Sequence, residues 1–327
     1  MSARLGRDPD LIQAGGGNTS VKLHSNLWIK ASGTWLIHAD RDDIFLPVSL
    51  TAIRACIDRN EEYVTNHHGL RPSVEAAMHA VLPHLCVVHV HSVNTLAWAS
   101  LADSPRSFAT RLEGLKWVWI PYIHPGLPLA LSIRETLGSS PDVIVMQNHG
   151  LIVAGDTCES AEALLHDVER RLRLHMRAHP PAQIDELRKL AGSAWQLPAD
   201  DGVHSLGTDP DSFRIATGGT LYPDHCVYLG HAVAACHSGQ APEDAAARYE
   251  RQWGKRPAVL ACEGYGVLIA PDLSRAGREM LTCISSVVRR IPADAEVHYL
   301  PHDQVSRLMN WDAEHYRQAV ARQMERQ

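Results

Sequence analysis

The segment VVHVHSVNTLAWA, residues 87–99, places two histidines two positions apart inside a strongly apolar run. Such a run predicts a buried strand, and successive side chains of a strand point to opposite faces. His89 and His91 therefore project from one face of this strand. Val88 and Val90 project from the other face. The histidine pair offers two metal ligands, and its ordinary alternative is two partly exposed histidines on a solvated face.

The composition of the 327-residue chain is typical of a soluble globular protein, with 45% hydrophobic and 21% charged residues. The formal charge is −6 and the 31 basic residues are scattered, so we expect no nucleic-acid partner. We find no signal-peptide pattern and no run of about 18 apolar residues, which predicts a cytoplasmic protein without a membrane partner. Seven cysteines at irregular spacings, with no CxxC pair, favour reduced thiols over a disulfide framework.

Helical and extended patterns alternate irregularly along the chain, which predicts a mixed α/β fold. A helix is expected over 72–82, directly ahead of the histidine strand. Farther on, VIVMQNHGLIVAGD (143–156) predicts two short strands divided by an NHG turn. A second long helix is expected from about 158 to 176.

Two linker-like stretches divide the chain, AHPPAQ at 178–183 and LPADDG at 197–202. They indicate a domain boundary in this region. We therefore expect a larger domain over 1–195 and a smaller α/β extension over 196–327.

The extension contains segments that resemble parts of the larger domain. AVLACEGYGVLIAPD (258–272) resembles the NHG hairpin, and FRIATGGTLY (213–222) resembles WIKASGTWL (28–36). The first likeness places Tyr265 opposite His149. The extension is accordingly interpreted as a possible degenerate half-repeat with a structural role.

A catalytic zinc site takes three protein ligands, commonly histidine nitrogens. His149 is the best third ligand, because a tight turn after a strand can aim its side chain. His124 and His231 are the alternatives. Glu75 is expected in the first turn of the helix over 72–82, where a carboxylate stabilises the helix start in any case. That helix leads into the histidine strand, so Glu75 could instead act as a proton shuttle or a fourth ligand.

The loop GGGNTS, residues 15–20, could bind an anion, because glycines let successive N–H groups converge. It lacks the lysine of a Walker A loop and the GxGxxG spacing of a dinucleotide site, and a plain turn is the alternative. The Ser32-Gly33 pair after a strand and Ser73 before a helix add two further anion-binding positions.

Six segments taken in order resemble the class II aldolase/adducin family of zinc-dependent sugar-phosphate aldolases and epimerases: GGGNTSV, KASGT, RPSVEAAMH, VVHVHSV, WIPYIHPG and VIVMQNHGLIVAG. They look closest to the rhamnulose-phosphate aldolase-like branch. The resemblance implies a three-layer α/β/α catalytic domain around a central mixed or antiparallel sheet. It implies metal ligands His89, His91 and His149, catalytic residues Glu75 and Tyr122, and a phosphate site of Gly17, Asn18, Ser32, Gly33 and Ser73.

The resemblance also implies a reaction, the reversible aldol cleavage of a ketose or ketose-phosphate. The products are a dihydroxyacetone(-phosphate)-type compound and an aldehyde, formed through a zinc-stabilised enediolate, with Mn²⁺ or Co²⁺ as other candidate metals. A decarboxylase or 4-epimerase using the same metal site is an alternative, as is a non-catalytic adducin-like module. The family further implies a homotetramer in which Tyr122 reaches the neighbouring subunit's site. Val74 stands where fuculose-phosphate aldolases have a second serine, which weakens the expected hold on phosphate.

Overall fold

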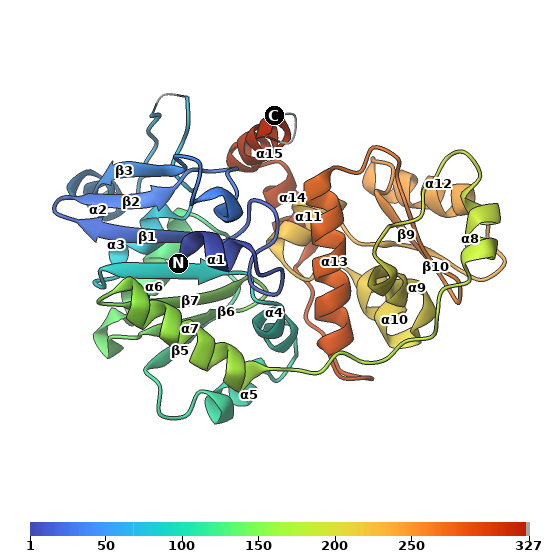
Figure 1. Cartoon of the computed structure of the whole chain (residues 1–327), viewed down its shortest axis with the longest axis horizontal. Helices are drawn as coiled ribbons and strands as arrows, with labels where there is room; N and C mark the ends of the chain where they lie inside the picture. The colour runs from blue at the N-terminus through green and yellow to red at the C-terminus, as the bar shows by residue number, and fades with distance from the viewer. Residues whose placement is uncertain (68, 325–327) are drawn as a thin grey trace. The chain divides into compact units, whose positions relative to one another are not determined.

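The computed structural model describes residues 1–67 and 69–324, and the chain divides into two compact units (Figure 1). Unit 1 consists of Met1–Ala99, Asp103–Arg173 and Asn310–Gln327, and unit 2 consists of Ser100–Ala102 and Leu174–Met309. This division differs from the boundary expected at 195/196. The chain leaves unit 1 after helix α7 (Cys158–Leu172) and returns to it with helix α15 (Asp312–Met324).

Unit 1 is built on a seven-stranded sheet with the strand order β3-β2-β1-β4-β7-β6-β5. The strands are β1 (Asn18–Leu23), β2 (Asn26–Lys30), β3 (Phe45–Ser49), β4 (Cys86–Val90), β5 (Trp117–Ile120), β6 (Val143–Met146) and β7 (Gly150–Gly155). β5 and β6 run parallel, and the other neighbouring pairs are antiparallel. The expected mixed sheet is confirmed, and β4 lies at its centre.

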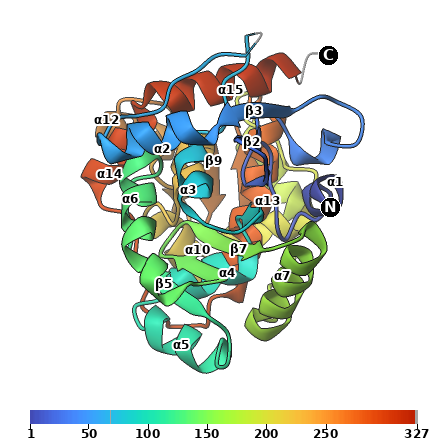
Figure 2. The ribbon, with the colours of Figure 1, turned by 90° about the vertical axis from the view of Figure 1, so that its left-hand side faces the viewer.

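Helices cover both faces of this sheet (Figure 2). On one face pack α2 (Leu50–Asp58), α3 (Ala76–Val81) and α6 (Leu127–Thr136), in an apolar cluster that includes Val87 and Ile152 of the strands. On the other face pack α4 (Val93–Ala99) and α7. The remaining helical segments of the unit are α1 (Ser2–Gly6), η1 (Leu36–His38), α5 (Ser104–Arg111) and η2 (Leu137–Ser139). Because His89 shares a strand face with Val87, β4 presents His89 to the side covered by α3.

Two helices are shorter than their sequence patterns predict. The helix expected over 72–82 begins only at Ala76, because Pro72 forms an antiparallel bridge with Ala31 and a turn at Val74 and Glu75 separates that bridge from the helix. The helix expected to reach residue 176 ends at Leu172. In the first case, pairing with the end of β2 competes with the first helical turn.

Unit 2 repeats part of the plan of unit 1. Its strands β8 (Ala234–Cys236), β9 (Val259–Cys262) and β10 (Gly266–Ile269) have the order β10-β9-β8. β8 and β9 are parallel and β9 and β10 form a hairpin, as β5, β6 and β7 do in unit 1. α12 (Pro242–Trp253) and α13 (Arg275–Arg290) follow β8 and β10, as α6 and α7 follow β5 and β7.

The two hairpins also share their register, which supports the interpretation of a degenerate repeat. Gly266 pairs with Cys262 as Gly150 pairs with Met146, so Tyr265 takes the turn position of His149. The predicted similarity between FRIATGGTLY and WIKASGTWL is wrong, because the two segments have different secondary structure. FRIATGGTLY begins within helix α10 (Pro210–Gly218), which starts with a proline and is capped by the side chain of Asp209, whereas WIKASGTWL begins in a strand.

The other helical segments of unit 2 are α8 (Ile184–Ala191), η3 (Asp201–His204), α9 (Ser205–Thr208), α11 (Pro223–Leu229) and α14 (His302–Met309). The seven cysteines of the chain are free thiols, five of them buried. Within the described part of the chain, no helix combines the length and apolar composition that crossing a membrane requires.

Candidate metal centre and active site

The imidazoles of His89, His91 and His149 converge at the centre of the unit 1 sheet. β4 carries His89 near its end, His91 follows directly, and His149 lies in the tight turn between β6 and β7. One ring nitrogen of each histidine lies within 4.8 Å of the others, and all three residues are buried. The Nε2 atoms of His89 and His91 are 3.0 Å apart. The structure therefore brings together the three residues that the sequence predicted as metal ligands.

The surroundings of His89 favour the form that binds a metal. Its Nδ1 atom lies 3.0 Å from the backbone oxygen of Leu151, so the N–H at Nδ1 donates there and the Nε2 lone pair faces the other histidines. Burial is the largest of the effects that lower the pKa of His89 to about 3, so the ring is neutral at physiological pH. Metal ligation requires a neutral imidazole.

Two backbone features make this convergence possible. Asn148 and Gly150 flank His149 and both have positive φ angles, +50° and +154°. A Cβ atom on Gly150 would lie 2.5 Å from the backbone oxygen of Val90, closer than real contacts allow. Only glycine therefore lets the turn approach β4 this closely.

Glu75 lies against the histidine cluster. It is the N-cap residue of α3, just before the helix and not within its first turn as expected, and its side chain caps no backbone N–H. Its Oε1 atom lies 3.0 Å from Nε2 of His149, and its Oε2 atom lies 3.5 Å from Nε2 of His89. The carboxylate therefore faces the histidines instead of stabilising the helix start.

Glu75 is held in its ionised form. Burial by itself raises the pKa of this carboxyl group, but the three neighbouring histidines outweigh burial and hold the pKa well below its ordinary value. The Nδ2 group of Asn18 donates to Oε2 of Glu75 across 2.7 Å and also contacts Oγ of Ser73 at 3.1 Å. Three imidazole nitrogens and one carboxylate form a donor set suited to Zn²⁺ and related divalent metals.

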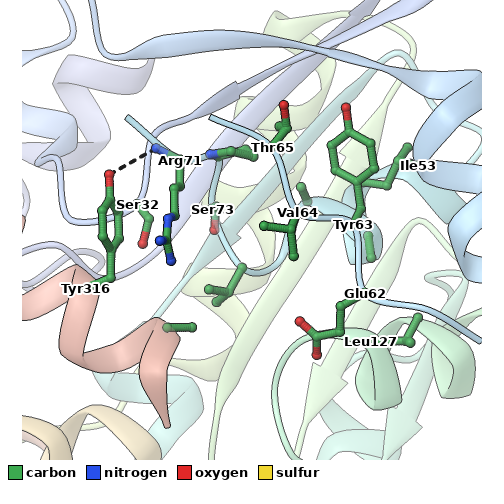
Figure 3. A pocket seen from close by; sticks show the side chains of 15 residues that line it. Ser32, Ile53, Glu62, Tyr63, Val64, Thr65, Arg71, Ser73, Leu127 and Tyr316 are labelled. Atoms are coloured by element: carbon green, nitrogen blue, oxygen red, sulfur yellow. Dashed lines mark hydrogen bonds between the residues drawn. The ribbon is translucent and has the colours of Figure 1, made fainter. Parts of the chain in front are cut away.

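Three of the residues predicted to bind phosphate lie near this centre, Gly17 and Asn18 beside His89 and Ser73 through its contact with Asn18. Asn18 pairs with His89 across β1 and β4, and Gly17 before it lies so close to β4 that a Cβ atom would be 2.9 Å from the backbone oxygen of His89. Ser32 and Ser73 line one cavity of about 90 Å³ (Figure 3). Gly33 lies against α15.

Comparison with known proteins identifies the family of the part of the chain that contains these residues. A family model described as the class II aldolase and adducin N-terminal domain matches residues 2–176, more than half of the chain. The chain belongs to the class II aldolase and adducin family. The matched residues include the histidine cluster, Glu75 and the glycine-rich loop.

Several relatives resemble the same half of this class II aldolase family member. An uncharacterized oxidoreductase YuxG of Bacillus subtilis is 30% identical over 178 residues, which cover 48% of this chain and 26% of that protein. The chain therefore spans about a quarter of that relative's length. A methylthioribulose-1-phosphate dehydratase of the same organism is 24% identical over 188 residues, 51% of this chain and 85% of the dehydratase. A class II aldolase domain from Thermoplasma acidophilum has 29% identity and a TM-score of 0.46, covering 52% of this chain and 88% of the other.

The alternative metal ligands lie elsewhere. The His124 ring packs against Trp311 with the ring centres 4.7 Å apart, and the His231 ring in unit 2 stacks on Trp253 at 4.2 Å. Tyr122 lies in the loop after β5, where its backbone N–H donates to Oε1 of Gln147, two residues before His149, across 3.2 Å. The Tyr122 loop is thus tied to the turn that carries His149.

Sequence reasoning missed Lys30 as a residue that organises the site. Lys30 is only 2% exposed, and its Nζ group donates to the backbone oxygens of Gly15 and Thr34, each at 2.8 Å. These bonds connect the glycine-rich loop to the turn that contains Ser32 and Gly33. The available signal was a lysine at the end of an apolar strand, since a buried ammonium group needs several acceptors.

Proposed function

We propose that this family member catalyses the metal-dependent, reversible aldol cleavage of a ketose or ketose-phosphate. The products are a dihydroxyacetone(-phosphate)-type compound and an aldehyde. The observation that carries the proposal is the buried cluster of three histidines with an ionised carboxylate 3.0 Å from one of them. A carboxylate at this position can remove a proton from the carbon beside a bound carbonyl group.

In the proposed reaction the three histidines, Glu75 and Tyr122 have different roles. His89, His91 and His149 would hold one divalent metal, which when bound supplies a Lewis acid for the charge that develops on the ketone oxygen. In the synthetic direction, Glu75 takes a proton from the nucleophilic carbon, and that carbon forms its bond to the aldehyde carbon. Tyr122 donates a proton to the aldehyde oxygen, and cleavage is the reverse sequence.

Asn18 and Ser73 support Glu75 in this role. Asn18 donates to one oxygen of the carboxylate, and Ser73 is joined to the same amide group. The hydrogen bond orients the carboxylate and favours its ionised form. A substrate bound at Ser73 would therefore lie next to the catalytic carboxylate.

The test is a substrate screen with the protein loaded with Zn²⁺, Mn²⁺ or Co²⁺. Ketoses, ketose 1-phosphates and oxo-acid phosphates are supplied, and released aldehyde and CO₂ are measured. We expect aldehyde without CO₂, and a loss of roughly 100-fold or more in kcat for Glu75→Gln, which keeps the shape but removes the base. Release of CO₂, epimerisation without cleavage, or loss of water from the substrate would each reject aldol cleavage in favour of another reaction.

A further inference from the structure

The cavity beside Ser32 and Ser73 receives residues from a helix that lies outside the family domain. α15 contributes Ala313 and Tyr316 to its lining, and the loop before α3 contributes Arg71 (Figure 3). We propose that Arg71, held against Tyr316 of α15, binds the anionic group of the substrate, a phosphate or a carboxylate. This inference rests on the proposed function, because it assigns the cavity to the substrate of that reaction.

Backbone pairing places Arg71 beside the two serines. The backbone N–H of Ser32 donates to the oxygen of Arg71 at 2.8 Å, and the N–H of Ser73 donates to the oxygen of Lys30 at 3.0 Å. Pro72 and Ala31 form the bridge between these bonds. Arg71, Ser32 and Ser73 are therefore fixed next to one another by the main chain.

Tyr316 fixes Arg71 from the other side. The Arg71 guanidinium carbon lies 4.5 Å above the centre of the Tyr316 ring, a cation–π arrangement. The Tyr316 hydroxyl accepts a hydrogen bond from the backbone N–H of Arg71 at 3.1 Å and donates to the oxygen of Gly69 at 3.0 Å. One side chain of α15 thus holds both the backbone and the cation of Arg71.

α15 also packs against the second half of the predicted phosphate site. A Cβ atom on Gly33 would lie 2.7 Å from the backbone oxygen of Arg317 and 2.7 Å from Cβ of Val320, so the helix is in close contact with the Ser32-Gly33 turn. The helix therefore forms one wall of the site, although residues 312–324 lie beyond the family match at 2–176.

The charge of Arg71 has no acidic partner in the described residues. No carboxylate among residues 1–67 and 69–324 forms an ion pair with Arg71, and Glu62 lines the opposite side of the cavity (Figure 3). The neighbouring Arg317, by contrast, is buried and bonds to Glu314 at 2.6 Å. An arginine beside two serine hydroxyls presents several donors to one anion.

Arg71 can also replace the hydroxyl donor that is missing at Val74. Val74 lines the cavity where fuculose-phosphate aldolases have a second serine, so one hydroxyl donor to the anion is absent. The guanidinium supplies charge and two parallel donors in its place, and charge-assisted bonds are roughly twice as strong as neutral ones.

The experiment measures anion binding to the full-length, zinc-loaded protein by calorimetry. Inorganic phosphate and glycerol 3-phosphate are the phosphate probes, and glycolate is the carboxylate probe. We expect Arg71→Met to weaken the preferred anion roughly 10- to 100-fold, as expected for a charged hydrogen-bonding partner. Tyr316→Leu should weaken it by roughly threefold, because the stacked ring no longer holds the cation.

The matched control is Arg106→Met, which removes an exposed arginine of α5 in the same unit, one that lies near Asp103. Its anion affinity should stay within about twofold of wild type, since an exposed surface charge contributes little. In the cleavage assay, Arg71→Met should raise KM for a ketose 1-phosphate while its kcat and its KM for the unphosphorylated ketose stay nearly constant.

The outcomes separate this inference from the proposed reaction. Anion binding needs no turnover, so an Arg71-dependent affinity in a protein that cleaves no ketose would reject the reaction and retain the anion site. A dependence seen with glycolate and absent with phosphate would identify the anion as a carboxylate. Equal affinities of wild type and Arg71→Met for every probe, or no binding by wild type, would overturn the assignment of Arg71.

Discussion

Replacing Gly150 with alanine tests how closely the His149 turn must approach β4. The new Cβ atom would lie 2.5 Å from the backbone oxygen of Val90 and 3.2 Å from Cε1 of His89. The backbone φ of +154° at this residue is also one that L-residues rarely adopt. The hairpin of β6 and β7 therefore has to move away from β4, and His149 moves with it.

The expected decrease in the free energy of unfolding has two contributions. Backbone strain costs on the order of 1–3 kcal/mol, and relieving an overlap in a packed region costs about 1–3 kcal/mol more. We therefore expect Gly150→Ala to lower the free energy of unfolding by roughly 2–6 kcal/mol. Displacing one ligand from the cluster should weaken zinc binding by about 10- to 100-fold, the range seen when the support of a ligand is lost.

Urea unfolding and a competitive zinc titration measure the two effects. Gly266→Ala is the matched control, because Gly266 has the equivalent position in the unit 2 hairpin and its Cβ would lie 2.7 Å from Nδ1 of His204. This control should destabilise the protein and leave zinc affinity unchanged. Wild-type stability and zinc affinity in the Gly150→Ala protein would show that the turn accommodates a side chain at this position without moving away from β4.

Two further predictions concern stability and assembly. Burial lowers the pKa of His225 to about 3, so the unfolded chain binds more protons below pH 6.5, and stability is full above that pH and falls as the pH decreases. Between pH 6.5 and 4.5 this histidine should lower the free energy of unfolding by about 2–3 kcal/mol. The His225→Asn protein should lose less unfolding free energy over the same pH range. Identical pH profiles of the two proteins would contradict this prediction. If Tyr122 acts on the site of a neighbouring subunit, mixing inactive Glu75→Gln and Tyr122→Phe proteins should restore activity. No recovery in proven mixed oligomers would place Tyr122 within its own subunit's site.

The convergence of the three histidines could be predicted because local rules govern their placement. Alternation along a strand puts His89 and His91 on one face, and the NHG turn brings His149 to the edge of the neighbouring strand. The structure places the three together. Glu75 was predicted within the first turn of a helix over 72–82 and is instead the residue just before the helix, because the bridge between Ala31 and Pro72 delays the helix start and local helical spacing does not report it.

The role of α15 could not be predicted from local patterns. Arg71 and Tyr316 are 245 positions apart, and nothing in the spacing of either segment indicates that they meet. The similarity between FRIATGGTLY and WIKASGTWL led to a wrong prediction of secondary structure for a related reason. An N-terminal proline and an aspartate cap turn the later segment into a helix, although the residue types match those of a strand.

The proposed metal centre is tested most simply by the metal content of the purified protein after loading with zinc and removal of excess metal. Wild type should retain about one zinc per chain, and His149→Ala and the double variant His89→Ala/His91→Ala should retain less than about a tenth of that. Arg106→Met, which changes only an exposed side chain of α5, serves as the folded control and should retain the wild-type content. Full zinc content in the double variant, or none in wild type, would contradict the assignment of these histidines as the metal centre.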